Sequence, residues 1–197
     1  MENIKKTLAY YDKNSEKLYD KYESANLENI QKYILKFIKK NDFILELGFG
    51  SGREINFLLK NGFKYVYGID GCKAFVEKAK KRFKSDKFYL SVLPEINIVN
   101  HIKFDFVFAI ALWMHLPTET YEKIIKNIVK LLKKNGKVLL SFSLEERKGE
   151  ERYFQKVDEK LLDLLFEKYG LKKINEMLTN DSLNRNITWK TVVYEKY

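Results

Sequence analysis

The chain has 197 residues, of which 45% are hydrophobic and 15% aromatic, so it can form one domain with a sizeable core and is too apolar for wholesale disorder. No apolar run approaches the roughly 18–20 residues that cross a bilayer, so we expect no membrane association. A single cysteine, Cys72, excludes an internal disulfide, and the presence of only two histidines argues against a metal site. The first six residues lack the apolar core of a signal peptide, which together with the lone cysteine predicts a cytoplasmic protein.

The predicted elements change in character along the chain. Residues 1–25 are rich in tyrosine and charge and are expected to form a helical lid or extension, ahead of a main domain at 26–197. Residues 26–40 carry apolar side chains at helical spacing. From residue 43 onward, short apolar runs alternate with amphipathic stretches. Strands are predicted at 43–47, 65–69, 87–91, 104–110 and 137–143. One helix is predicted between the first two strands, ending at residues 61–62, and others are predicted at 73–83 and 120–133.

The end of the chain adds a different arrangement. The helix at 120–133 is expected to be capped by Thr118 and to end at Asn135-Gly136. A helix at 157–168 and strands at 171–178 and 187–195 follow, and the short polar loop between these strands favours an antiparallel hairpin. The predicted fold class is therefore α/β, with a mostly parallel seven-stranded sheet, helices on both faces and an antiparallel C-terminal strand.

A glycine-rich turn follows the first predicted strand. Residues 46–53 read ELGFGSGR and open a helix, and the second apolar run ends in Asp70, 22 residues after Gly48. Glycines allow a backbone to approach a ligand closely, and a helix N-terminus presents free N–H groups to it. An acid after the second strand can hold ribose hydroxyls. Together these features predict a nucleoside-binding unit.

The glycine spacing indicates which cofactor this unit binds. A dinucleotide fingerprint reads G-x-G-x-x-G and seats a pyrophosphate. Here the glycines stand at 48, 50 and 52, and Glu46 would repel a pyrophosphate and suit an ammonium group. The pattern resembles motif I of the class I S-adenosylmethionine-dependent methyltransferases. This resemblance implies a Rossmann-like methyltransferase fold over about residues 26–197, with the motif holding the methionine end of the cofactor and Asp70 its ribose. Dinucleotide binding, or a structural glycine turn without a nucleotide, are the alternatives.

The candidate cofactor-binding residues lie mostly at the carboxyl ends of the predicted strands, where doubly wound sheets bind ligands. They are Glu46, Gly48, Phe49, Gly50, Gly52, Arg53, Asp70, Gly71, Cys72, Ser91, Val92, Leu93, Ala109 and, from the N-terminal segment, Tyr19. Asp70 could also cap the helix at 73–83. Family members often carry an acid for the adenine amino group where this chain has Ser91, so backbone groups around Val92 and Leu93 are an alternative adenine contact.

The segment after the fourth strand supplies candidate acceptor-binding residues. It lacks the Asn/Asp-Pro-Pro-aromatic motif of enzymes that methylate bases, and it resembles the apolar-His-Leu loop of many small-molecule methyltransferases. His115 is the candidate catalytic base near its ordinary pKa, with packing or helix capping as the alternative. Trp113 is expected to wall the site, or else to lie in the core. Tyr11, Arg147 and Arg185 complete the set, and Arg185 would bind a carboxylate or phosphate unless it forms a surface ion pair.

The predicted function is methyl transfer from S-adenosylmethionine to a small-molecule acceptor by direct displacement, in a monomer or homodimer. Alignment of the acceptor with the methyl carbon and sulfonium supplies most of the acceleration, so the reaction does not require a catalytic dyad. The net charge of +10 leaves an RNA or protein methyltransferase as the first alternative, although only five of the 37 basic residues are Arg. A non-catalytic module that binds S-adenosylmethionine is the second alternative.

Overall fold

The sheet has the predicted topology. The computed structural model describes residues 2–98, 102–147, 149–182 and 185–197, and within them seven strands form one sheet in the order β3-β2-β1-β4-β5-β7-β6. The strands are β1 (Ile44–Leu47), β2 (Val66–Asp70), β3 (Phe88–Leu90), β4 (Phe104–Ile110), β5 (Leu132–Ser143), β6 (Leu171–Asn180) and β7 (Thr188–Lys196). β7 runs antiparallel to both β5 and β6, and the other neighbours are parallel. The predicted fold class is confirmed.

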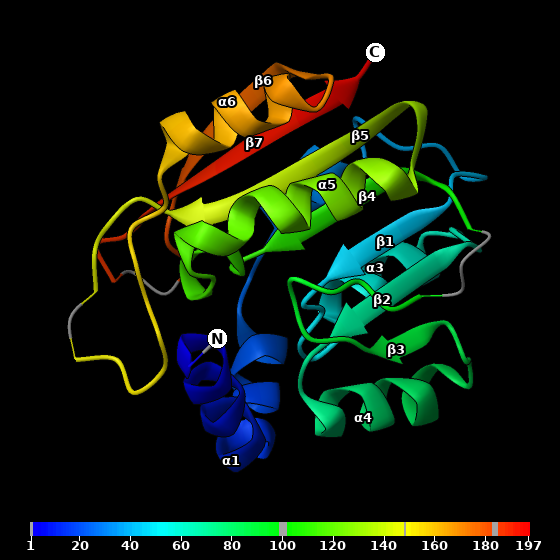
Figure 1. The fold of residues 1–197 in the computed structure, drawn as a ribbon. Helices are drawn as coiled ribbons and strands as arrows, with labels where there is room; N and C mark the ends of the chain where they lie inside the picture. The colour runs from blue at the N-terminus through cyan, green and yellow to red at the C-terminus, as the bar shows by residue number, and fades with distance from the viewer. Residues whose placement is uncertain (1, 99–101, 148, 183–184) are drawn as a thin grey trace.

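Helices cover both faces of the sheet (Figure 1). They are α1 (Glu2–Ser24), α2 (Glu28–Ile34), α3 (Arg53–Lys60), α4 (Lys73–Phe83), α5 (Tyr121–Leu131) and α6 (Glu159–Lys168). α5 and α6 pack on one face of the sheet, and α2, α3 and α4 pack on the other. Because side chains alternate along a strand, Leu45 joins the first apolar cluster and Ile44 the second. This alternation turns Glu46 toward α3 and Leu47 toward α5.

The region between α5 and β5 differs from the prediction. The helix ends at Leu131 and β5 begins at once, so Asn135-Gly136 lies inside a strand and does not end the helix. The register between β4 and β5 shifts here, and Asn135 has a φ of 60°. The pair therefore forms an irregularity in β5. Asn and Gly adopt the backbone conformations of such an irregularity as readily as those of a helix end. The predicted cap was also wrong, because Thr118 lies in a separate 3₁₀ turn (Thr118–Thr120) before α5.

The N-terminal segment forms a long helix beyond the carboxyl ends of the central strands (Figure 1). Ile4 and Leu18 of α1 are buried, so the helix packs on the domain. Its neighbour α2 is shorter than predicted and ends at Ile34. None of the helices among the described residues is long and apolar enough to cross a membrane. The fold therefore positions α1 over the edge of the sheet at which α/β proteins bind ligands.

Candidate functional site

A cavity of about 590 Å³ lies at this edge of the sheet. Its volume falls within the roughly 300–1,000 Å³ typical of small-molecule sites. The glycine turn, α1, the loop after β5 and the β6–β7 connection all contribute to its wall. The predicted site residues that line it are Tyr11, Glu46, Gly48, Phe49, Gly50, Arg53, Asp70, Gly71, Ser91, Val92, Leu93, His115, Arg147 and Arg185. The structure therefore brings together residues that are as far apart in the sequence as 11 and 185.

The glycine turn forms a cradle that leaves no room for side chains. Gly48, Gly50 and Gly52 have φ angles of +67°, +55° and +77°, a region that favours glycine. A Cβ atom on Gly48 would lie 2.9 Å from Cδ1 of Leu112, and one on Gly50 would lie 3.2 Å from Cδ2 of Tyr22. A side chain at Gly48 or Gly50 would therefore crowd residues that line the cavity beside the turn.

Glu46 presents a buried carboxyl group to the cavity. Only 2% of the residue is exposed, and Oε2 has no hydrogen-bond partner among the described residues. Burial raises the pKa of Glu46 well above its ordinary value, and the neighbouring carboxylates of Glu54 and Asp70 raise it further, while Arg53 acts in the opposite direction. A buried carboxyl oxygen without a partner is costly unless a ligand satisfies it. A cationic donor such as an ammonium group fits this position.

Asp70 connects β2 to the glycine turn. Its Oδ2 accepts a hydrogen bond from the Gly50 N–H, and its Oδ1 accepts one from the Cys72 N–H, both at 2.8 Å. Burial raises the pKa of Asp70 to about 6, and the backbone hydrogen bonds limit the rise. Cys72 occupies the N-cap position of α4 without a side-chain capping bond, so Asp70 is not the N-cap. Each carboxylate oxygen can still accept a second hydrogen bond, as from a ribose hydroxyl.

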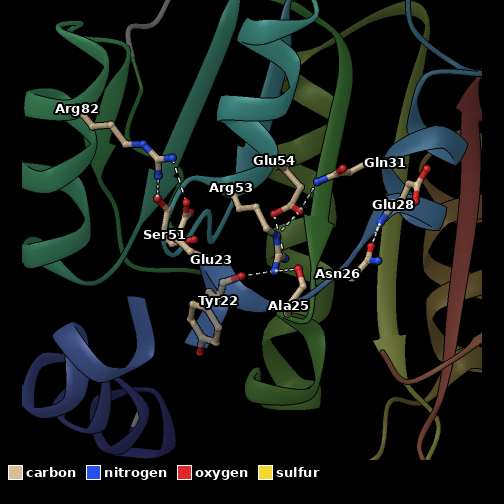
Figure 2. Close-up of polar contacts among 10 residues, drawn as sticks. All are labelled: Tyr22, Glu23, Ala25, Asn26, Glu28, Gln31, Ser51, Arg53, Glu54 and Arg82. Carbon is tan, nitrogen blue, oxygen red and sulfur yellow. Dashed lines mark hydrogen bonds and ion pairs between the residues drawn. The ribbon is translucent and has the colours of Figure 1, made fainter. Parts of the chain in front are cut away.

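Arg53 anchors the end of α1 to the glycine turn (Figure 2). Its Nη1 donates to the carbonyl oxygens of Tyr22 and Ala25, the latter at 3.3 Å. Its Nε donates to Oε1 of Glu54 at 2.7 Å. These bonds satisfy carbonyl groups that a helix end leaves unpaired. Arg53 lines the cavity as predicted, but its guanidinium group holds α1 in place.

A second arginine makes a similar connection from α4. Arg82 donates to the carbonyl oxygen of Ser51 at 3.2 Å, to Oε2 of Glu23 at 3.0 Å and to the hydroxyl of Tyr19 at 2.9 Å (Figure 2 shows the first two). The position of α1 is thus linked to both sides of the glycine turn. Tyr19 does not line the cavity, because its hydroxyl is turned toward Arg82 on α4. Its expected cofactor contact is corrected accordingly.

Three further predicted residues lie close to the cavity but do not line it. A Cβ atom on Gly52 would face the ring of Phe83 at 3.0 Å, away from the cradle. Cys72 is 1% exposed and packs in the cluster beneath α4. Ala109 is fully buried inside β4, on the face that α5 covers. These residues shape the site only through the backbone.

Trp113 belongs to the core. It is fully buried, and its ring centroid lies 4.8 Å from that of Tyr121 in an edge-to-face arrangement. It is not among the residues that line the cavity. Of the two alternatives that the sequence left open, the structure favours packing, and the expectation that Trp113 walls the site is corrected.

Ser91 lines the cavity but uses its hydroxyl locally. Oγ donates to the carbonyl oxygen of Glu95 at 2.9 Å and accepts from the Asn97 N–H at 2.8 Å. The hydroxyl therefore holds the turn after β3 and offers little to an adenine ring. Val92 and Leu93 also line this part of the cavity and leave apolar surface and backbone groups for such a contact.

His115 is buried in the wall of the cavity, with 5% of the residue exposed. Its Nδ1 lies 2.8 Å from the carbonyl oxygen of Tyr153, which can only accept, so Nδ1 carries the proton. Burial and the nearby charge of Arg152 lower the pKa of His115 to about 3. The expectation of an ordinary pKa was therefore wrong. The ring is neutral, and Nε2 is a hydrogen-bond acceptor.

The loop after β5 and α1 meet over the cavity. Arg152 Nη1 donates to the Tyr11 hydroxyl at 2.8 Å, and the Tyr153 N–H donates to Oγ1 of Thr7 at 3.2 Å. The Tyr22 hydroxyl lies 3.4 Å from that of Tyr11. Sequence reasoning missed Arg152 and Tyr22 as site residues, although Tyr22 lies in the segment that was expected to form a lid. The two segments together close one side of the cavity.

Arg185 is engaged in a paired interaction. Its Nη2 donates to Oδ1 of Asp181 at 2.7 Å, and its Nε donates to Oδ2 at 2.9 Å. These hydrogen bonds hold the pKa of Asp181 well below its ordinary value. The ion pair, which was the alternative in the sequence, therefore describes Arg185 better than an unpaired anion-binding arginine does.

Comparison with known proteins agrees with this geometry. Residues 45–140 match the family described as a methyltransferase domain. No curated protein matches the sequence at a significant level. The magnesium protoporphyrin IX methyltransferase of Synechocystis PCC 6803, solved with S-adenosylhomocysteine, is 14% identical; the match covers 99% of this chain and 100% of that one, with a TM-score of 0.78.

Two other solved structures illustrate the range of proteins with this fold. The 1,6-didemethyltoxoflavin-N1-methyltransferase of Burkholderia thailandensis, with 1,6-didemethyltoxoflavin and S-adenosylhomocysteine bound, is 15% identical over 98% of this chain and 88% of that one, with a TM-score of 0.77. The [4+2]-cyclase SpnF is 12% identical over 86% and 80%, with a TM-score of 0.66, so the fold alone does not dictate methyl transfer. Motif, sheet order and family match agree: residues 45–140 match the methyltransferase domain family, and the whole chain has the fold of solved methyltransferases that hold S-adenosylhomocysteine.

Proposed function

We propose that the protein transfers a methyl group from S-adenosylmethionine to a small-molecule acceptor. The observation that carries this proposal is a single cavity that extends from the glycine turn to the underside of α1 and the loop after β5. Hydrogen bonds between Arg152 and Tyr11 and between Tyr153 and Thr7 join these two covers. An acceptor that fits beneath them is small, whereas a polymer would require an open groove.

The residues at the glycine turn fit the cosubstrate. Glu46 offers a buried carboxyl oxygen to its amino group, and Asp70 offers carboxylate oxygens to its ribose. Gly48 and Gly50 allow the close approach of its methionine part, and Val92 lies in the wall where adenine would pack. When bound, S-adenosylmethionine supplies a methyl group on a sulfonium cation, which is open to in-line attack.

The remaining residues exclude water and orient the acceptor. The carboxyl groups of Glu46, Glu54 and Asp70 face the end of the cavity where a positive charge would lie. His115 accepts a hydrogen bond at Nε2 from an O–H or N–H of the acceptor, and its lowered pKa suits orientation better than full proton removal. Proximity and alignment then supply most of the acceleration.

The N-terminal segment has a separate role in this proposal. Residues 1–25 act as a lid over the domain at 26–197, because α1 is hydrogen-bonded to Arg53 at the glycine turn and to Arg152 in the loop after β5. We place the enzyme in the cytoplasm, as the lone cysteine predicts, in a monomer or homodimer. RNA and protein acceptors remain alternatives because of the net charge of +10.

Calorimetry with S-adenosylhomocysteine and NAD tests the cosubstrate site. Gly50→Ala fills the cradle, and Gly62→Ala is the matched control, since Gly62 also has a positive φ but lies in open space. We expect S-adenosylhomocysteine to bind the wild type more tightly than NAD. Gly50→Ala should lose at least about tenfold in affinity, or about 1.4 kcal/mol, while Gly62→Ala keeps it. Tighter binding of NAD, or equal affinity of Gly50→Ala and the wild type, would contradict the proposal.

A further inference from the structure

Arg147 lines the far end of the cavity and has unpaired hydrogen-bond donors. Its Nε and Nη2 atoms are buried and have no partner among the described residues. Its Nη1 lies 3.9 Å from Oε1 of Glu150, which is too long for a hydrogen bond. Buried donors without an acceptor are costly, so a site that retains them is suited to a ligand that satisfies them.

The guanidinium group of Arg147 is held in place by two aromatic rings. Its Cζ lies 4.8 Å from the ring centroid of Phe154 and 5.9 Å from that of Trp189. Its side chain is 15% exposed, and burial lowers its pKa, as does the charge of Arg185. Stacking against aromatic rings orients the planar group without using its N–H donors. The two free nitrogens therefore point in a fixed direction.

The other two arginines at this end already have acceptors. Arg185 forms two hydrogen bonds with Asp181, and Arg152 donates to Tyr11 and lies 3.3 Å from Glu150. We define the acceptor end of the cavity as Arg147, Glu150, Arg152, Asp181 and Arg185. Its three arginines face two carboxylates. This end is therefore positively charged, and among its described residues the buried donors without a partner belong to Arg147.

The part of the cavity wall at the glycine turn and the start of α3 has the opposite charge. Glu46, Glu54 and Asp70 line it together with Arg53. An acidic end suits the sulfonium and ammonium groups of the cosubstrate, and a basic end suits an anion. A cavity polarised in this way favours an acceptor that is negatively charged on the side away from its methylated atom.

We propose that the methyl acceptor carries a carboxylate group, and that Arg147 binds it through Nε and Nη2. These nitrogens form one edge of the guanidinium group, and the two oxygens of a carboxylate match that edge in a bidentate pair. This inference rests on the proposed function, because it assigns the acceptor of the same cavity. It also transfers to Arg147 the anion-binding role that the sequence suggested for Arg185.

Calorimetric titrations of the protein saturated with S-adenosylhomocysteine test this proposal. The probes are benzoate and phenylacetate, their neutral carboxamides, and phenyl phosphate as a second oxyanion. The variants are Arg147→Gln, Arg147→Lys and, as a matched control, Lys156→Gln, which removes an exposed positive charge from the same segment outside the cavity. Affinity for S-adenosylhomocysteine is measured for each protein as a check on folding and on the cosubstrate site.

We expect the wild type and Lys156→Gln to bind at least one acid about tenfold or more tightly than its amide, as a charge-assisted bidentate contact implies. Arg147→Gln should lose this preference, and Arg147→Lys should keep only part of it, because an ammonium group cannot form the two-bond fork. Equal or absent binding of acids and amides by the wild type, or a preference that survives in Arg147→Gln, would overturn the proposal. Tighter binding of phenyl phosphate than of either acid would replace the carboxylate by a phosphate. Failure of the wild type to bind S-adenosylhomocysteine would instead contradict the proposed function.

Discussion

Replacing Glu46 with glutamine should change the way stability depends on pH. Burial and the charge of Glu54 raise the pKa of Glu46 from its ordinary value of 4.5. Between 4.5 and the raised value, the folded protein holds a proton that the unfolded chain has released. As the pH rises through this window, the free energy of unfolding of the wild type therefore falls by about 1.4 kcal/mol for each pH unit. Glutamine has no such proton, so the Glu46→Gln variant lacks this loss.

The effect is measurable as a difference in melting temperature. For a chain of this size, 1 kcal/mol corresponds to roughly 2–4 °C, so the melting temperature of Glu46→Gln minus that of the wild type should grow by roughly 3–6 °C per pH unit. Thermal unfolding without cosubstrate, from about pH 4.5 to about pH 8, measures it. Glu77→Gln, at an exposed position on α4, is the control and should show no such trend. At neutral pH, Glu46→Gln should also bind S-adenosylhomocysteine more weakly by roughly 1.5–3 kcal/mol. A difference that stays constant with pH, or that appears equally in the control, would refute the reasoning.

Three further predictions concern the other titratable groups of the site. Asp70→Ala should weaken binding of S-adenosylhomocysteine by roughly 1.5–3 kcal/mol, because it removes an acceptor for the ribose and leaves the Gly50 N–H unpaired; unchanged calorimetric affinity with a lower melting temperature would make the carboxylate purely structural. Since the pKa of Asp70 is about 6 and ribose hydroxyls favour its ionised form, wild-type affinity should also fall as the pH drops below about 6, and an affinity constant down to about pH 5 would contradict this. Because the pKa of His115 is lowered to about 3, the pH–rate profiles of the wild type and of His115→Gln at saturating cosubstrate should have the same shape. If the rate of the wild type rises with pH near 6.5 and that of the variant does not, His115 titrates in the working range and the prediction is wrong.

Most of the fold was predictable because its signals are local. The apolar run at 104–110 forms β4 with the predicted bounds. The glycine turn, with Glu46 before it and Asp70 after the second strand, identified the β1–α3–β2 unit. The Asn135-Gly136 pair misled the prediction because a helix end and an irregular strand need the same backbone freedom. The pairs Phe104–Leu132 and Phe106–Lys137 on either side place Asn135-Gly136 inside a strand. Local residues cannot report such a partner.

The acceptor side was less predictable because its chemistry depends on partners distant in the sequence. His115 looked like an ordinary base, yet the carbonyl of Tyr153 fixes its tautomer and the charge of Arg152 helps to lower its pKa. Arg147 and Arg185 were both candidate acceptor-binding residues in the sequence, and only Arg185 was expected to bind an anion. The structure distinguishes them, because Arg185 is bonded to Asp181 and Arg147 stacks on aromatic rings with donors to spare.

Transfer of labelled methyl groups tests the central claim most directly. The purified protein is incubated with S-adenosylmethionine labelled in the methyl group and with a cell extract separated into small-molecule, RNA and protein fractions. Gly50→Ala, whose cradle is filled, serves as the background reaction. We predict that the wild type transfers label to the small-molecule fraction alone and that Gly50→Ala does not. Label in RNA or protein, or no transfer to any fraction by a wild-type protein that binds S-adenosylhomocysteine, would contradict the proposed methyl transfer to a small molecule.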